Sequence, residues 1–211
     1  MAEVIDIYDA NLLKVGQEER LRAHIDGLWH TTFHLWIVLV ASPGFVLYQL
    51  RSPTAKNYPN LLDITAAGHL LSGERVQEGI REAKEELGMD IAPNSIHTLG
   101  WRVEVADQDN GQKNREHQAV HMVALDTTLD SFRPDPAEVY GLVQVPIEDG
   151  LQLHAGSLTS LECPARLFDP ATKQWRDTTE VVTSARFLTR IQPYYRTVHI
   201  MAERLWWAGA D

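Results

Sequence analysis

Residues 68–89 read GHLLSGERVQEGIREAKEELGM, which is a glycine-bearing loop followed by a short acidic helix. On a repeat of about 3.6 residues, four apolar side chains share one narrow stripe, the spacing of a buried helix face: Val76, Ile80, Ala83 and Leu87. Four acids fall on the side and back of the same helix: Glu78, Glu82, Glu85 and Glu86. The stretch therefore predicts a helix that packs on one side and carries dense negative charge elsewhere.

The carboxylates of this helix are close enough to repel one another. Glu82 and Glu86 are four residues apart, and Glu82 and Glu85 are three apart, so their side chains are neighbours on the helix surface. Negative charge near a helix C-terminus also opposes the helix dipole. Bound cations would offset both effects, and hard divalent ions with oxygen ligands, Mg²⁺ above all, suit the cluster best. The alternative is an acidic helix face that is simply solvated.

The residues around these acids resemble a known signature. Gly68 is followed after five residues by Glu74, and the run Arg-Glu-Ala-Lys-Glu-Glu-Leu-Gly occupies residues 81–88. This order resembles the Nudix box, the signature of hydrolases that cleave a diphosphate linked to another moiety. One departure is the spacing from Glu74 to Arg81, which has six intervening residues where the box usually has seven. Such a deletion could shift Glu74 relative to the helix.

The resemblance implies a metal site at the box. Mg²⁺ or Mn²⁺ would be held by Glu85 and Glu86, with help from the Gly68 carbonyl. Glu82 or Glu85 would complete the site, one as a metal ligand and the other as the general base. Because the base differs among Nudix proteins, the choice between these two stays open.

Further residues would support that site by the same resemblance. Arg81 would pair with Glu74 and hold the loop against the helix. Glu116 would supply an additional acid to the metal from outside the box. For Glu116 the alternative is a surface charge at the end of a strand.

Sequence outside the box narrows the resemblance. The run LYQLRSP at residues 47–53, followed by Lys56, is similar to the isopentenyl-diphosphate isomerase branch of the Nudix proteins, and so are residues 20–30. In those isomerases an Arg and a Lys before the box bind the substrate diphosphate, and Arg51 and Lys56 stand at matching places. A cationic pair in an acidic protein suits a phosphate, which Arg can bind in bidentate fashion. Solvated loop charges are the alternative.

The same comparison argues against isomerase chemistry. The isomerase carries a catalytic cysteine just before its Gly-His pair, and Ala67 stands there in this chain. A methyl group can neither donate nor accept the proton that allylic isomerisation requires. The single cysteine, Cys163, is almost a hundred residues away and does not match the motif, so we expect it to be inert.

The isomerase metal site is also incomplete by sequence. Its upstream histidines are matched by His24 and His30, which are six residues apart here rather than seven. Glu116 matches one of two glutamates in a late strand, whereas Gln118 replaces the second, and a neutral amide cannot supply the missing charge. We therefore expect the histidines of this region to pack or form hydrogen bonds rather than bind a metal: His24, His30, His34 and His69.

Composition favours a folded enzyme of the cytoplasm. The chain has 211 residues, 44% of them hydrophobic, with six Trp, which argues against disorder. Its net charge of −10 argues against nucleic acid as a partner. One cysteine excludes an internal disulfide framework and is consistent with a reducing compartment. Residues 1–9 do not read as a signal peptide, and the longest apolar run, residues 35–41, is too short to span a membrane.

The order of strands and helices predicts an α+β fold. We expect strands at residues 4–8 (an edge strand), 33–41, 45–50, 61–67, 97–106, 117–125 and 139–145. We expect helices at residues 17–24, 75–87 and 194–207. The Nudix resemblance implies an α/β/α sandwich with a mixed β-sheet. Residues 1–154 would form the Nudix domain, and residues 155–211 a C-terminal hairpin-plus-helix extension packed on it.

The role of the C-terminal extension is open at this point. We favour a helix that covers the sheet, because apolar side chains recur at helical spacing in residues 194–207. The alternative is a homodimer surface, or a lid on which Tyr194, Tyr195 or Trp206 stacks against a base.

The function expected from the sequence is metal-dependent hydrolysis of the phosphoanhydride bond of a small organic diphosphate. One alternative is a catalytically silent Nudix-like module that binds a ligand, since the box is shortened. Another is an isopentenyl-diphosphate isomerase, against which Ala67 is the discriminating residue. The isomerase-like loop favours prenyl or other small non-nucleotide diphosphates, but only by analogy.

Overall fold

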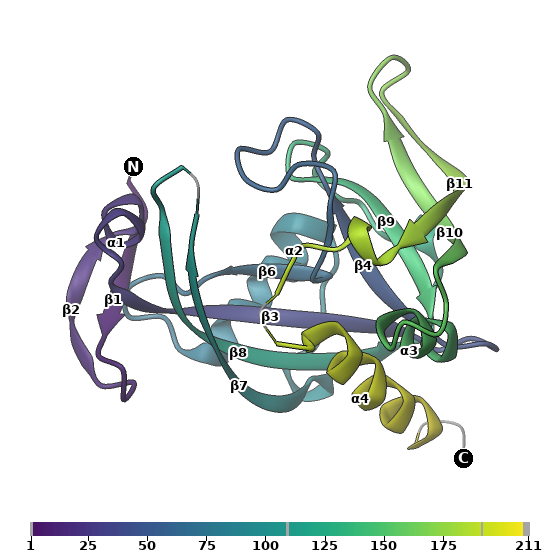
Figure 1. The fold of residues 1–211 in the computed structure, drawn as a ribbon. Helices are drawn as coiled ribbons and strands as arrows, with labels where there is room; N and C mark the ends of the chain where they lie inside the picture. The colour runs from purple at the N-terminus through teal and green to yellow at the C-terminus, as the bar shows by residue number, and fades with distance from the viewer. Residues whose placement is uncertain (1, 109, 191, 209–211) are drawn as a thin grey trace.

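The computed structural model describes residues 2–108, 110–190 and 192–208 (Figure 1). Its strands are β1 (Val4–Tyr8), β2 (Lys14–Glu19), β3 (Trp29–Leu39), β4 (Phe45–Arg51), β5 (Leu62–Asp63), β6 (Ala66–His69), β7 (His97–Asp107), β8 (Lys113–Leu125), β9 (Val139–Pro146), β10 (Ser160–Asp169) and β11 (Gln174–Thr183). Its α-helices are α1 (Arg20–Asp26), α2 (Arg81–Leu87), α3 (Ile147–His154) and α4 (Tyr194–Ala208). The described strands join in one sheet with the order β11-β10-β9-β4-β3-β1-β2; β5 pairs with β4, β6 and β8 pair with β3, and β7 pairs with β8.

Strand β3 is the centre of this sheet. It runs parallel to β8 from the pair His30–Glu116 to the pair Leu39–Leu125, and antiparallel to β1, β4 and β6. All of its residues after Trp29 are buried, which explains why the sequence reads as a nearly continuous apolar run. The parallel pairing makes the sheet mixed, as predicted.

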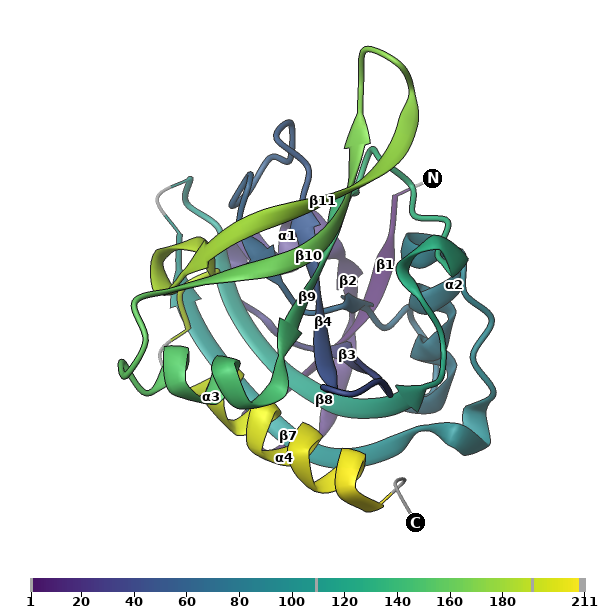
Figure 2. The same ribbon diagram turned by 90° about the vertical axis from the view of Figure 1, so that its right-hand side faces the viewer.

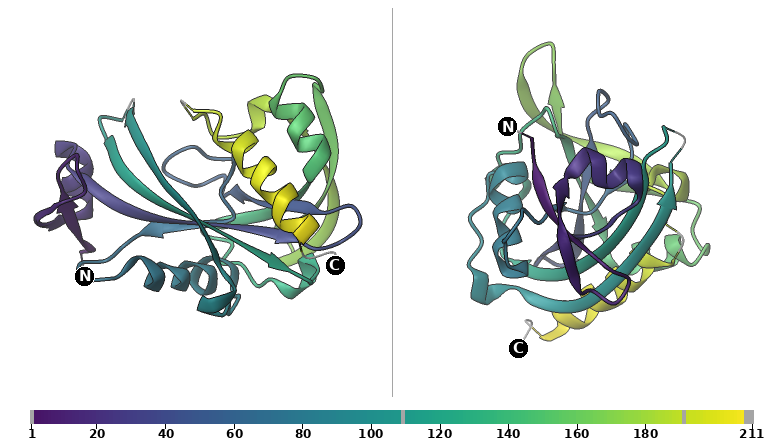
Figure 3. Two further views of the ribbon diagram at one scale, coloured as in Figure 1. Left: turned by 90° about the horizontal axis from the view of Figure 1, so that it is seen from below. Right: turned by 90° about the vertical axis from the view of Figure 1, so that its left-hand side faces the viewer.

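Alternate side chains of β3 point into two separate cores. Phe33 and Leu35 pack with Ala83 and other apolar residues of the α2 side. Trp36 packs on the opposite face with residues of α4, including Val198. Seen from below, α2 lies on one side of the sheet and α3 and α4 lie on the other (Figure 3). The predicted α/β/α sandwich is confirmed.

The C-terminal hairpin extends the sheet. β10 pairs with β9 through residues 165–167, and the far end of the β10–β11 hairpin projects beyond the body of the protein (Figure 2). Cys163 on β10 is buried, and its burial raises the pKa of the thiol to about 12. A thiol with so high a pKa has little thiolate character, in keeping with an inert role. None of the described helices is both long and apolar enough to cross a membrane.

Several predicted elements differ from the structure. Residues 17–19 belong to β2, and the helix expected at residues 17–24 begins only at Arg20. β2 is the edge strand, so β1 is flanked on both sides rather than lying at the edge. Because β2 is mostly exposed, its sequence lacks the apolar alternation that identifies a half-buried strand. The short helix α3 was not predicted.

The α2 helix is shorter than expected, because residues 76–80 form a 3₁₀ turn in front of it. Tyr194 and Tyr195 are buried in the α4-side core, so the alternative in which they stack on a substrate base is wrong. The Trp206 side chain lies outside the part of the chain described at side-chain level.

Helices α3 and α4 make their closest approach at Gly150. A Cβ atom at residue 150 would lie 2.1 Å from Cε1 of His199. His199 is buried; its Nδ1–H donates to the Ile147 carbonyl at 3.0 Å, and its Nε2 accepts from the Tyr48 hydroxyl at 3.0 Å. Burial lowers the pKa of His199 to about 3, so the ring is neutral, as this pair of hydrogen bonds requires.

We predict that Gly150→Ala destabilises the protein by about 1–3 kcal/mol. Alanine should gain about 1 kcal/mol of helix propensity, but the clash displaces a ring held by two buried hydrogen bonds, and this larger effect should prevail. The measurement is the free energy of unfolding in urea. The control is Gly16→Ala on β2, where the added Cβ would meet Ile7 at an ordinary 3.5 Å. A more stable Gly150→Ala variant would contradict the packing described here.

Candidate active site

A cleft of about 1150 Å³ lies between α2, the loop at residues 52–60 and the β7–β8 hairpin. Its walls include most of the site residues expected from the sequence: Arg51, Lys56, Gly68, Arg81, Glu82, Glu85, Glu86 and Glu116. Glu74 reaches this group through its ion pair with Arg81. The fold therefore brings residues that lie more than 60 positions apart in the sequence together in one concave surface.

The backbone of Gly68 makes room for the carboxylate of Glu82. A Cβ atom at residue 68 would lie 2.0 Å from Oε1 of Glu82 and 2.2 Å from its Cδ, so any other side chain there would displace the carboxylate. Gly68 is positioned by the pairing of β6 with β3 at Phe33, and Glu82 lies in the first turn of α2. β6 and α2 together place the buried carboxylate of Glu82 against the backbone of Gly68.

Glu86 is held one turn further along the helix. Its Oε2 accepts the backbone N–H of Ala67 at 3.1 Å and is 3.5 Å from the Gln49 amide nitrogen. Burial, followed by the charge of Glu82, raises the pKa of the Glu86 carboxyl well above its usual range. Burial also raises the pKa of Glu82 to about 7, although Arg81 opposes the shift. Two such carboxyls, both buried and adjacent, are stabilised by a proton or by a cation.

Arg81 joins the loop to the helix. Its Nε and Nη2 donate to the two carboxylate oxygens of Glu74 at 2.7 and 3.2 Å, and Nη2 also donates to the His69 carbonyl at 2.9 Å. Its Nη1 donates to Glu82 and to Glu85, both at 2.7 Å. The Glu85 side chain is 57% exposed and faces the cleft, whereas that of Glu82 is only 10% exposed.

The shortened spacing of the box does not separate Glu74 from Arg81. The intervening residues include the 3₁₀ segment at residues 76–80. A 3₁₀ helix rises about 2.0 Å per residue against about 1.5 Å in an α-helix, so fewer residues span the same distance. The ion pair between Arg81 and Glu74 at 2.7 Å shows that six intervening residues are enough to join them.

Arg51 lies at the end of β4 and Lys56 in the loop that follows it, and both line the cleft. Arg51 donates from Nε and Nη2 to the Asn57 carbonyl at 3.2 and 3.1 Å, which fixes the plane of its guanidinium. Its side chain is 29% exposed and, with Lys56, lines the cleft. Both cations are placed where an anionic ligand could reach them.

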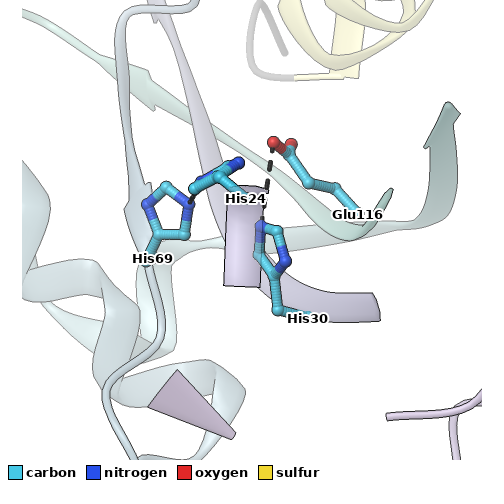
Figure 4. A group of neighbouring side chains, drawn as sticks. All are labelled: His24, His30, His69 and Glu116. Atoms are coloured by element: carbon cyan, nitrogen blue, oxygen red, sulfur yellow. Dashed lines mark hydrogen bonds and ion pairs between the residues drawn. The ribbon is translucent and has the colours of Figure 1, made fainter. Parts of the chain in front are cut away.

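A second group of ligating side chains lies in the same cleft (Figure 4). His24 from α1, His30 from β3, His69 from β6 and Glu116 from β8 point toward one another, and their ligand atoms all lie within 4.8 Å of one another. The sequence predicts that this set is too incomplete to bind a metal, and it places Glu116 with the acids of the box. The structure instead groups Glu116 with three histidines, which is enough for a four-coordinate site.

The hydrogen bonds of His30 prepare it as a ligand. Its Nδ1–H donates to the Leu28 carbonyl at 2.9 Å, which leaves the lone pair of Nε2 directed toward Glu116, 3.9 Å from Oε1. That Nε2 is buried and has no hydrogen-bond partner among the described residues. Burial lowers the pKa of His30 to about 4, so the imidazole is neutral near pH 7. A lone pair facing a carboxylate is repulsive unless a cation lies between them.

Two residues of the isomerase comparison take other roles. Gln118 donates to Oε2 of Glu116 at 2.7 Å and accepts from Arg102, so it orients the carboxylate instead of replacing a ligand. His34, which the sequence grouped with the other histidines, hydrogen-bonds through Nδ1 to the Tyr194 hydroxyl at 3.0 Å.

Sequence reasoning missed a buried ionic network in the wall of the cleft. Arg190 pairs with Asp63 at 2.8 Å and with Glu104 at 3.1 Å, and Glu104 also pairs with Arg102. Arg190 and Asp63 are 127 residues apart, so no local spacing could have connected them.

Comparisons with known proteins identify the family of this chain. A family model described as NUDIX domain matches residues 30–161. Over 150 residues the chain is 34% identical to an uncharacterized Nudix hydrolase of Clostridium acetobutylicum, covering 70% of this chain and 71% of that protein. It is 31% identical over 140 residues to the isopentenyl-diphosphate Delta-isomerase of Halorhodospira halophila, covering 65% of this chain and 76% of the isomerase.

A solved structure supports the fold independently. The crystal structure of a Deinococcus radiodurans protein superposes with a TM-score of 0.54 at 24% identity, covering 73% of this chain and 90% of that one. The NUDIX match spans more than half of the chain and contains Gly68, Arg81 and the acids of α2. The chain therefore belongs to the Nudix hydrolase family.

Proposed function

We propose that this protein hydrolyses the phosphoanhydride bond of a small organic diphosphate, with Mg²⁺ or Mn²⁺ bound by the acids of α2. The observation that carries the proposal is the contact between Gly68 and Glu82, because a glycine is needed to leave room for this carboxylate. Membership of the Nudix hydrolase family supports it.

The residues of the box fit a divalent cation. Glu82 and Glu86 are buried carboxylates with raised pKa values, and Glu85 lies beside them at the cleft surface. Carboxylate oxygens together with a backbone carbonyl, here that of Gly68, are ligands that Mg²⁺ and Mn²⁺ prefer. When bound, the ion neutralises charge on the diphosphate and polarises its phosphorus–oxygen bonds.

Side chains of the protein would bind the substrate, orient the carboxylates and accept the proton. Arg51 and Lys56 would bind the diphosphate oxygens, and Arg81 would fix the orientation of the box carboxylates. Glu82 or Glu85 would accept the proton of a water molecule as that water attacks phosphorus and the anhydride bond breaks. The products are two phosphate species, one of them carrying the organic group.

A second ion fits the histidine cluster. Three neutral imidazole nitrogens and one carboxylate favour a borderline transition metal such as Zn²⁺ or Co²⁺ over Mg²⁺. Because its ligands come from α1, β3, β6 and β8, such an ion would fix the N-terminal helix to the sheet at the edge of the cleft.

The alternatives are less well supported. Ala67 cannot perform allylic proton transfer, which argues against an isomerase. Glu74, Glu82 and Glu85 all pair with Arg81, an arrangement that a silent binding module would not need. Most side chains that line the cleft are polar or charged, so a small polar organic group fits better than the prenyl chain that the sequence favoured.

We predict that Glu85→Gln and Glu86→Gln each lower turnover by more than about a hundredfold, because each removes a charge that holds the ion. Turnover is measured as phosphate products released from a panel of organic diphosphates with Mg²⁺ or Mn²⁺. Circular dichroism should show an unchanged fold. Glu78→Gln is the matched control, since Glu78 pairs with the exposed Arg75. Normal turnover in both box variants would refute the assigned roles.

We predict that Gly68→Ala lowers turnover by about a hundredfold, because displacing a carboxylate of the site by about 1 Å can lower the rate by this factor. The loss of stability should stay below about 2 kcal/mol, since the displaced group is the end of a flexible side chain. Turnover and urea unfolding are measured together, with Gly16→Ala as the control. An active Gly68→Ala enzyme would show that the close approach of Glu82 is not required.

We predict that the wild-type protein binds one transition-metal ion at the histidine cluster and that His69→Ala weakens this binding by more than about tenfold. Metal content after dialysis against Zn²⁺, Mn²⁺ or Co²⁺ is measured by mass spectrometry. His97→Ala, on the exposed start of β7, is the control. Equal metal content in the wild type and the His69→Ala variant would remove the second ion from the proposal.

A further inference from the structure

The segment before α4 folds back onto the wall of the cleft. Phe187 forms a parallel bridge with Leu62, the Leu188 N–H donates to the Leu62 carbonyl at 3.0 Å, and the Tyr195 hydroxyl donates to the Leu188 carbonyl at 3.0 Å. These contacts place Arg190 beside Asp63. The segment lies beyond residues 30–161, the part of the chain that matches the NUDIX domain.

Arg190 is engaged by two carboxylates. Its side chain is 9% exposed; Nη2 donates to Oδ1 of Asp63 at 2.8 Å, and Nη1 donates to Oε1 of Glu104 at 3.1 Å. Because both terminal nitrogens already donate to protein groups, Arg190 is better placed to act on its neighbours than to bind a ligand itself.

Asp63 lies between Arg190, which forms a hydrogen bond with it, and Arg51, which is farther away. Its Oδ1 is bonded to Arg190 and accepts from the Tyr195 hydroxyl at 3.4 Å, whereas its Oδ2 is 3.7 Å from Nη1 of Arg51. The distance of 3.7 Å is too long for a hydrogen bond. Since the Asn57 carbonyl holds Nε and Nη2 of Arg51, Nη1 is the end of the guanidinium that faces Asp63 and that a freed Asp63 carboxylate would capture.

We infer that Arg190 is a positioning residue: it retains the Asp63 carboxylate and so keeps Arg51 available for the substrate diphosphate. This inference rests on the proposed function, in which Arg51 binds the diphosphate. Without Arg190, Asp63 is left with Arg51 as its cationic partner, and a charge-assisted pair between them competes with the substrate. Loss of the positive charge of Arg190 also makes the wall of the cleft more repulsive to an anion. Both effects lower diphosphate affinity.

The test measures binding of methylenediphosphonate, a diphosphate that cannot be hydrolysed, by calorimetry in the presence of Mg²⁺. We expect Arg190→Gln to weaken binding by about tenfold, the size of one charge-assisted hydrogen bond. Adding Asp63→Asn to Arg190→Gln removes the competing carboxylate and restores the net charge of the wall, so affinity should return to near the wild-type value. The matched control is Arg186→Gln in the same segment, where Arg186 pairs with Glu180 away from the cleft.

Two further arms keep the inference testable. Asp63→Asn alone leaves Arg190 paired with Glu104, and it should bind the diphosphonate as tightly as the wild type or more tightly. If Arg190→Gln fails to fold, Asp63→Asn alone tests the inference. Weaker diphosphonate binding in Asp63→Asn would show that Asp63 positions Arg51 instead of competing for it. With a hydrolysed substrate, Arg190→Gln should raise KM while kcat stays nearly unchanged.

The outcomes separate this inference from the proposed function. Unchanged affinity in Arg190→Gln, no recovery in the double variant, or weakened binding in Asp63→Asn would each overturn the role of Arg190. A wild-type protein that binds the diphosphonate but hydrolyses no organic diphosphate would overturn the proposed reaction and leave the positioning role standing. A wild-type protein that binds no diphosphonate would overturn both.

Discussion

The carboxylate of Glu82 lies where a side chain of residue 68 would be, and the geometry of the whole site depends on this approach. It requires α2 to pack very close to the sheet. A second glycine meets the same demand, because a Cβ atom at Gly79 would lie 2.6 Å from Cβ of Phe33 on β3. Two glycines therefore set the distance between the helical segment and the sheet, and Arg81 holds Glu82 and Glu85 in place through hydrogen bonds to both.

The central strand explains how one sheet serves both stability and chemistry. One set of alternate side chains on β3, with Phe33 and Leu35, forms the core under α2. The other set carries polar groups into the cleft, where the register pairs His30 with Glu116 on the parallel strand β8. Because strand neighbours in register point to the same face, the pairing of β3 with β8 brings His30 beside Glu116. His69 joins them from β6 and His24 from α1. The packing that stabilises α2 thus also aligns the polar groups of the cleft.

The parts of the site that could be predicted from the sequence are those encoded locally. The box acids lie within one short helix, so their spacing alone indicated a shared surface, and the strand pattern indicated the sandwich. Two differences from the isomerase pattern argue against a metal at the histidines: the spacing of His24 and His30, and Gln118 in place of a second glutamate. In the structure α1 nevertheless ends at Gly27, in a left-handed conformation with φ of 69°, and the ring centroids of His24 and His30 lie 4.7 Å apart. Arg190 and Asp63 meet only through the tertiary fold, and no pattern in one sequence reveals such a pair.

The charge of the cleft explains why an acidic protein can be expected to bind a polyanion. Among the described residues, ten acidic side chains line the cleft, against five basic ones. Arg81 and Arg190 are already committed to carboxylates, so the remaining cations cannot balance the acids. Two divalent ions, one at the box and one at the histidines, would offset four of the five excess negative charges. In the proposed function, affinity for a diphosphate in this cleft would therefore depend first on bound cations, and Arg51 and Lys56 would refine the position of a ligand that those ions attract.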